Sequence, residues 1–328
     1  MQDLDREIEN KYCINIKSIV PYRDAHIINT SKGKKLLRKT MLLPDRIMFI
    51  HGAKEHLYKN DFRNLDRYLC TADGNPCIVI DGNLFTVSDV MEGRECNFDD
   101  VNDVINAAKI LASMHRASKG YISPPNSKPR DELGKLPLYF SKRLEDIKRL
   151  KNIAKKEGSR FDFLFLKYFD YFFKLGENTI GQINHSRYSE LVKKVKANGT
   201  FCHHDFTYHN IICSESRTSV INFDYCCFEL KVYDLANFIR RKMRKCNWEV
   251  EEAKIILDKY CSIEDISKDE IDILKIILQF PQKFWRVANK YYNSKRSWTE
   301  KSYLSKLQEV IDEIEYHKNF IEKFEMLF

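Results

Sequence analysis

Residues 200–237 constrain the fold of this chain more than any other stretch. A polar segment, 203–210, is followed by two short apolar runs, 211–213 and 220–223, with a polar turn between them. Apolar runs of this length on either side of a turn predict a buried hairpin. The sequence therefore predicts a polar loop that a pair of buried strands holds in place.

The polar loop has the form H-x-D-x-x-x-x-N, with His203, Asp205 and Asn210 at the fixed positions. This is the spacing of a kinase catalytic loop, in which the aspartate accepts the proton of the substrate hydroxyl and the asparagine holds Mg²⁺. We predict these two roles for Asp205 and Asn210, and we expect His203 to brace the loop. The same residue types also form ordinary loops through hydrogen bonds to the backbone. The strand pair that follows favours the catalytic interpretation.

Several segments together resemble one known family. The runs CHHDFTYHNI, VINFDYC and YDLANFIRR resemble the core of the aminoglycoside phosphotransferase and choline kinase superfamily, and within it the CotS-type spore coat proteins. Segments elsewhere follow that family in order, at residues 12–39, 49–58, 87–95, 111–121 and 280–285. The resemblance implies an α+β, protein-kinase-like fold with two lobes. Residues 1–90 would form a small antiparallel β-rich N-lobe with one helix, and residues 91–328 a larger, mainly helical C-lobe.

Local patterns give the expected elements. Apolar and β-branched runs predict strands near residues 14–20, 25–29, 35–40, 68–70, 77–80 and 84–87. A helix is expected at 53–59, and another after an N-cap at Asp99 or Asp100. Aromatic residues at helical spacing in 161–175 predict a core-facing helix.

The resemblance places the second metal ligand of the family twelve positions before Asp234, where this chain has Asn222. An asparagine offers a metal ion a carbonyl oxygen but no negative charge. Asp224 follows two residues later and, on a strand, would face the same side. The predicted metal ligands are therefore Asn210, Asn222 and Asp224, at a site whose affinity for Mg²⁺ is reduced.

The phosphate-binding lysine of the family falls on Arg38, with Lys39 as the alternative, and its acidic partner falls on Glu55. Arginine is not a conservative exchange there, because its planar fork reaches differently from an ammonium group. The hinge whose backbone pairs with adenine corresponds to Ser88, Asp89 and Val90. ATP and Mg²⁺ are the cofactors that the resemblance implies, while the departures from the family pattern argue against strong binding of either.

The composition excludes other classes of function. The net charge of +8 is modest for 328 residues and does not indicate a nucleic-acid partner. The basic cluster 240–245 continues an amphipathic helix, so we expect its charges to be solvated. The first residues lack the pattern of a signal peptide, and no apolar run is long enough for a membrane span, which predicts synthesis in the cytoplasm. Ten cysteines without metal-binding spacing indicate buried free thiols.

Two functions follow from these features. In the first, the resemblance implies a spore coat protein, made in the bacterial mother cell, with other coat proteins as partners and weak or absent phosphotransferase activity. In the second, the chain is an active ATP-dependent phosphotransferase of a small hydroxyl-bearing molecule, with Asp205 as the base. Asn222 and Arg38 favour the first function, whereas Asp205 and Asn210 favour the second. The sequence does not name a phosphate acceptor.

Overall fold

The computed structural model describes residues 2–31, 33–293 and 299–327. Contacts divide the chain into two compact units, the first made of Met1–Asp131 with Asn198–Phe228 and the second of Glu132–Ala197 with Glu229–Phe328. All residues predicted for the catalytic loop, the metal site and the nucleotide site lie in the first unit. The lobe boundary at residue 90 stays a prediction. Among the described helices, none has both the length and the apolar composition needed to cross a bilayer.

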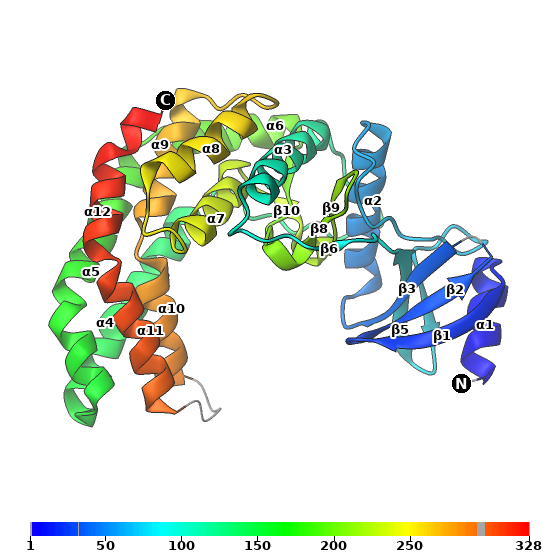
Figure 1. Ribbon diagram of the computed structural model, residues 1–328, viewed down its shortest axis with the longest axis horizontal. Coiled ribbons are helices and arrows are strands. Elements are labelled where there is room, and N and C mark those ends of the chain that lie inside the picture. The colour runs from blue at the N-terminus through cyan, green and yellow to red at the C-terminus, as the bar shows by residue number, and fades with distance from the viewer. Residues whose placement is uncertain (1, 32, 294–298, 328) are drawn as a thin grey trace. The chain divides into compact units, whose positions relative to one another are not determined.

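The first unit begins with a five-stranded antiparallel sheet in the order β1-β2-β3-β5-β4 (Figure 1). Its strands are β1 (Ile16–Tyr22), β2 (Ala25–Thr30), β3 (Gly33–Thr40), β4 (Cys77–Ile80) and β5 (Asn83–Asp89). The predicted strand at 68–70 is the exception, because only Tyr68 forms a bridge there, to Ser88. Hydrogen bonds between Leu69 and Val87 and between Asp89 and Arg67 hold this segment against the end of β5.

Two helices accompany this sheet, one more than expected. In α1 (Gln2–Tyr12), Ile8 and Tyr12 are buried in one apolar cluster with Leu37 and Val87 of the sheet. The rest of α1 is strongly polar, so its apolar face is narrow. Hydrophobic periodicity therefore did not predict this helix. The second helix, α2 (Pro44–Lys59), begins well before the predicted segment, with proline in its first turn.

Short strands complete the first unit. A three-stranded sheet contains β6 (Arg94–Glu95), β8 (Ile211–Cys213) and β9 (Thr218–Val220), and β7 (Phe201–Cys202) pairs with β10 (Cys227–Phe228). The predicted hairpin is thus present as β8 and β9. Helix α3 (Val101–Ser118) starts at the predicted cap Asp100, whose side chain accepts hydrogen bonds from the N–H groups of Asn102 and Asp103.

The second unit is helical. Its helices are α4 (Leu136–Glu157), α5 (Arg160–His185), α6 (Tyr188–Asn198), α7 (Val232–Met243), α8 (Val250–Cys261), α9 (Lys268–Gln279), α10 (Gln282–Asn293), α11 (Glu300–Asp312) and α12 (Ile314–Lys323). Figure 1 shows α4, α5, α10 and α11 side by side. The predicted aromatic core of α5 is confirmed by four buried phenylalanines that pack with Phe284 and Leu307: Phe161, Phe165, Phe169 and Phe172.

The basic cluster of α7 is solvated only in part: Arg241 and Lys245 are exposed as the sequence predicted, whereas Lys242 and Arg240 are not. Lys242 is only 6% exposed and forms an ion pair with Glu252 at 3.0 Å. Arg240 donates to the side chain of Asn237 and to the backbone oxygen of Ile277, and burial lowers its pKa to about 10. Both side chains lie on the packed side of α7 because neighbouring helices supply carboxylate and carbonyl partners.

Candidate functional site

A buried histidine holds the loop between β7 and β8. His203 is fully buried, and its Nε2 lies 3.0 Å from the carbonyl oxygen of Ile221. Its Nδ1 accepts a hydrogen bond from the backbone N–H of Asp205 at 3.3 Å, which places the ring proton on Nε2. The histidine therefore ties the loop to the segment that follows β9, as the sequence predicted.

Asp205 and Asn210 are joined directly. The amide nitrogen of Asn210 donates to both the backbone oxygen and the Oδ2 of Asp205, each at 2.9 Å. Asn210 ends η1 (Tyr208–Asn210), a single 3-10 turn that brings these two side chains together. Because this nitrogen is bonded to Asp205, the Oδ1 of Asn210 remains available as an acceptor.

Asn222 connects Asn210 to Arg38. Its Nδ2 donates to Oδ1 of Asn210 at 3.3 Å, and its Oδ1 accepts a hydrogen bond from Nη1 of Arg38 at 3.1 Å. The two ends fix the orientation of both amides, since the Asp205 carboxylate can only accept and the Arg38 guanidinium can only donate. We refer to this path through Asp205, Asn210, Asn222 and Arg38 as the amide chain.

Asn222 does not lie on a strand, contrary to prediction. The strand β9 ends at Val220, and Asn222 has left-handed backbone angles, φ 65° and ψ 66°, which asparagine tolerates better than most residues. The 3-10 helix η2 (Phe223–Tyr225) follows at once. Asp224 nevertheless contacts the same guanidinium as Asn222, because its Oδ2 lies 3.1 Å from Nη1 of Arg38. A turn, not strand alternation, brings the two side chains together.

Arg38, and not Lys39, is the basic residue of β3 that reaches this site. Leu37 is buried in the core on one face of the sheet, so Arg38 points to the opposite face, and Lys39 is exposed. The predicted partner Glu55 does not pair with Arg38. It forms a two-pronged ion pair with Arg67, at 3.0 Å to Nε and 2.7 Å to Nη2, because its side of α2 faces the segment that follows that helix.

The sequence interpretation missed a buried ion pair beneath the amide chain. Lys54 is 1% exposed, and its Nζ lies 3.0 Å from Oδ1 of Asp66 and 3.9 Å from the ring centre of Tyr68. The other carboxylate oxygen of Asp66 accepts the backbone N–H of Asn222 at 3.2 Å. Burial raises the pKa of Asp66, an effect that Lys54 opposes. A signal was present, because Lys54 falls on the buried stripe of α2 formed by Ile47, Ile50 and Leu57.

The predicted hinge lies at the end of the sheet. Ser88 and Asp89 belong to β5, where they pair with Leu36 and Lys35 of β3. The backbone N–H of Asp89 donates to the oxygen of Arg67 at 2.9 Å, so it is not available to a base. Val90 is the one predicted hinge residue that lies beyond the strand. Its role in binding adenine stays a prediction.

The turn between β1 and β2 is tied to the catalytic loop. Arg23 lies at its tip, and its Nη2 is 2.8 Å from Oε1 of Glu95. The second oxygen of Glu95 lies 2.6 Å from Nδ1 of His209. The Arg23 guanidinium, and after it His209, lower the pKa of Glu95. Protein kinases use a glycine-rich turn to cover the phosphates, whereas this turn has no glycine and carries a salt bridge.

The residues at the expected metal position do not fit Mg²⁺ in this arrangement. Mg²⁺ requires near-octahedral oxygen ligands at about 2.0–2.1 Å. Here an N–H of Asn222 faces Oδ1 of Asn210, and the Asp224 carboxylate pairs with a guanidinium. The positive charge beside Asn222 and Asp224 is the guanidinium of Arg38.

The sheet and the braced loop define a protein of the kinase-like fold class. A solved aminoglycoside phosphotransferase from Alicyclobacillus acidocaldarius is similar, with a TM-score of 0.84 at 19% identity, over 95% of this chain and 92% of that one. Spectinomycin phosphotransferase, solved with ADP and spectinomycin, gives a TM-score of 0.64 at 15% identity, over 96% and 97%. These similarities confirm the predicted α+β, kinase-like fold.

Sequence comparison identifies the family within this class. The family model described as "Spore coat putative kinase YutH" matches residues 5–324, and the chain belongs to that family. Spore coat protein S of Bacillus subtilis strain 168 is 25% identical over an alignment of 339 positions, which covers 98% of this chain and 96% of that protein. The predicted resemblance to spore coat proteins with an aminoglycoside phosphotransferase and choline kinase type of fold is confirmed.

Proposed function

We propose that this protein is a spore coat component in which the amide chain has replaced the metal site of a kinase. It binds ATP weakly and without dependence on Mg²⁺, and it does not transfer phosphate at the rate of a kinase. The observation that carries this proposal is the position of Asn222, whose amide bridges the expected metal ligand Asn210 to Arg38.

Electrostatics explain why replacing the metal site by the amide chain would remove phosphotransferase activity. Phosphoryl transfer draws most of its catalysis from cations that neutralise the charge of the transferring group. In this site the guanidinium of Arg38 is bonded to Asn222 and Asp224, so it is neither a bridging metal ion nor a free phosphate clamp. The turn at Arg23, which is tethered to Glu95, supports the same conclusion, because it lacks the glycines with which protein kinases approach the phosphates.

The coat location rests on the family and on the relative in Bacillus subtilis. Other coat proteins are the proposed partners. A fluorescent fusion made in sporulating cells is expected to form a shell around the forespore, and coat extracts of mature spores are expected to contain the protein. Uniform fluorescence in the mother cell, with no protein in the coat extract, would contradict this location.

One observation favours the alternative, an active phosphotransferase of a small hydroxyl-bearing molecule. Asp205 and Asn210 keep the direct contact and the histidine brace that a catalytic loop requires. A structural neighbour, spectinomycin phosphotransferase, was solved with ADP and spectinomycin. In this alternative Asp205 accepts the proton of the substrate hydroxyl.

ATP turnover by the purified protein separates the two functions. We expect wild type and Asp205→Ala to release phosphate from Mg²⁺–ATP equally slowly, and the exposed-site control Asp73→Ala to behave in the same way. Loss of a general base from a working site lowers the rate by about 10²–10⁴-fold. A loss of that size in Asp205→Ala alone would establish the phosphotransferase and overturn our proposal.

A further inference from the structure

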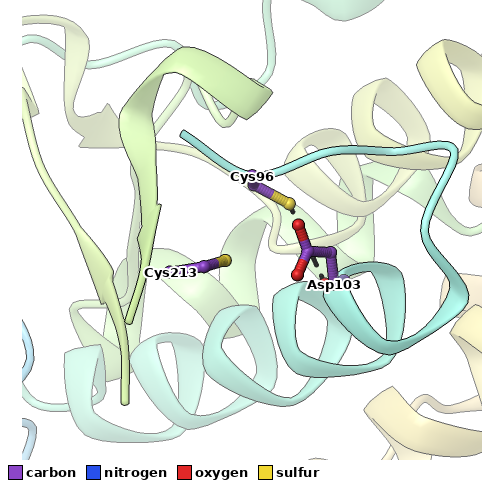
Figure 2. A group of neighbouring side chains, drawn as sticks. All are labelled: Cys96, Asp103 and Cys213. Atoms are coloured by element: carbon purple, nitrogen blue, oxygen red, sulfur yellow. Dashed lines mark hydrogen bonds between the residues drawn. The ribbon is translucent and has the colours of Figure 1, made fainter. Parts of the chain in front are cut away.

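Three buried side chains meet at a point that the catalytic loop does not use. Cys96, Asp103 and Cys213 each offer one ligand atom, and these atoms all lie within 4.8 Å of one another. Their exposed fractions are 3%, 4% and 7%. Figure 2 shows the two sulfur atoms directed toward the Asp103 carboxylate, from the segment after β6 and from the end of β8.

The pairing of β6 with β8 creates this arrangement. Arg94 lies opposite Cys213, and the N–H of Cys96 donates to the oxygen of Ile211 at 2.9 Å, so both cysteines are on the same face, two positions apart. Gly93 allows the close approach of the strands, because a Cβ there would lie 2.5 Å from the carbonyl oxygen of Cys213. The first turn of α3 brings in Asp103.

The geometry disfavours a disulfide and favours a shared ligand. Diagonal positions of an antiparallel pair have Cα atoms about 7–8 Å apart, beyond the usual span of a disulfide. The Cys96 thiol instead donates to the backbone oxygen of Asp103 at 3.9 Å, and the two sulfurs lie within 4.8 Å of each other. The contact with Cys96 lowers the pKa of Cys213 and raises that of Cys96. A cysteine binds a metal as the thiolate, so metal binding would release both thiol protons.

The charges at this cluster match a divalent cation. Arg94 pairs with both oxygens of Asp103, and the N–H of Asn97 donates to Oδ2 at 2.7 Å. A carboxylate accepts about four hydrogen bonds or ligands, so one position remains on Oδ1. Two thiolates and this carboxylate carry three negative charges, and Arg94 offsets one of them. A cation of charge two neutralises the remainder, and Arg94 orients its ligand.

We propose that Cys96, Asp103 and Cys213 bind a borderline-soft divalent cation, Zn²⁺ above all. Thiolate ligands select zinc over Mg²⁺ and Ca²⁺, and Zn–S and Zn–O bonds of about 2.3 and 2.0–2.2 Å need only a modest contraction of the cluster. An open pocket of about 340 Å³, lined among others by Asp103, Cys213 and Glu215, adjoins it. Water from this pocket fills the fourth position. The metal thereby joins the connector after β6, the start of α3 and the end of β8.

Titration of metal-free, reduced, full-length protein tests this site. We expect one equivalent of Co²⁺ to produce a thiolate-to-cobalt charge-transfer band with the d–d bands of tetrahedral geometry, and one equivalent of Zn²⁺ to abolish both. Cys96→Ser, Cys213→Ser and Asp103→Asn are each expected to weaken Zn²⁺ binding at least tenfold. Cys77→Ser, which removes a thiol from β4, is the matched control and is expected to keep full affinity.

A readout on wild type keeps the test independent of the folding of these variants. Zn²⁺ is expected to slow alkylation of Cys96 and Cys213, mapped by mass spectrometry, and to leave Cys77 unaffected, while Mg²⁺ protects none of them. Absence of the thiolate–cobalt band from the wild type would overturn the proposal. Equal protection of Cys77, or equal loss of affinity in Cys77→Ser, would also overturn it.

Discussion

Asn222→Asp is expected to raise the affinity for ATP in the presence of Mg²⁺ by about 10–100-fold, the effect of one charged ligand contributing about 1.5–3 kcal/mol. The new carboxylate has no N–H to donate to Oδ1 of Asn210. The hydrogen bond between residues 222 and 210 is therefore lost, and the expected metal position becomes free. Calorimetric titration of each protein with ATP, with and without Mg²⁺, measures the change. Asn83→Asp adds the same charge at the start of β5, away from the site, and is expected to have no effect.

Arg38→Lys is expected to raise the affinity for Mg²⁺–ATP further. Combined with Asn222→Asp, it should raise that affinity by more than the sum of the two separate effects. Nη1 of Arg38 contacts both Asn222 and Asp224, and we expect the shorter lysine to lose these contacts and to be free to reach a phosphate. Because both substitutions act on one triphosphate geometry, their effects are coupled, and a double-mutant cycle measures the coupling. Arg63→Lys, at an exposed arginine, is the matched control.

The double variant is also expected to hydrolyse Mg²⁺–ATP faster than wild type, and Asp205→Ala in that background should remove the gain. If wild type already matches the double variant and depends on Asp205, the loss of the metal site is refuted. The protein would then hold its metal through Asp224 or another geometry.

Lys54→Met is expected to destabilise the protein by about 3–5 kcal/mol, since removal of one partner of a buried ion pair leaves an uncompensated charge. Lys54 is fully packed between Asp66 and the ring of Tyr68, and Asp66 also anchors the backbone of Asn222. Denaturant unfolding measures the change. Lys59→Met removes an exposed lysine from the same helix and is expected to stay within about 0.5 kcal/mol of wild type.

The destabilisation by Lys54→Met should grow as the pH rises. Burial raises the pKa of Asp66 in the folded state, and the loss of Lys54 raises it further. A carboxyl group whose pKa is raised by folding contributes most to stability at low pH. That contribution falls as the pH rises from the group's pKa in the unfolded state toward its pKa in the folded state. The loss should therefore be smaller at mildly acidic than at mildly alkaline pH. Lys54→Met/Asp66→Asn should show much less of this pH dependence, and an equal dependence would contradict our assignment to Asp66.

Sequence patterns were sufficient for the parts of the site that are local. The H-x-D-x-x-x-x-N spacing predicted that His203 braces the loop, and the structure has this contact because it spans only two residues. The roles of Asp205 and Asn210 stay predictions. The resemblance placed the basic residue at Arg38, and β3 directs Arg38 rather than Lys39 toward Asn222; its role at a phosphate stays a prediction. The prediction that Glu55 pairs with Arg38 was wrong, because Glu55 pairs with Arg67. Which of the two arginines it meets depends on the rotation of α2 about its axis, and tertiary packing decides that rotation.

Features that depend on backbone detail or on distant segments were beyond prediction. The predicted strand through Asn222 ends at Val220, where a left-handed residue and a 3-10 turn follow. The sequence did not reveal this end, because the apolar pattern continues through the turn. The cluster of Cys96, Asp103 and Cys213 has no sequence spacing to recognise. It forms only when β6 pairs with β8, more than a hundred residues apart in the chain.

The most direct test of the central claim is calorimetric titration of the wild-type protein with ATP, in excess Mg²⁺ and again in excess chelator. We propose that Arg38 and the amide of Asn222 occupy the position of the metal. This proposal predicts weak binding with nearly the same dissociation constant in both titrations. Tight binding that the chelator abolishes would contradict the account, because it would require a metal ion at the position where the structure has the amide chain.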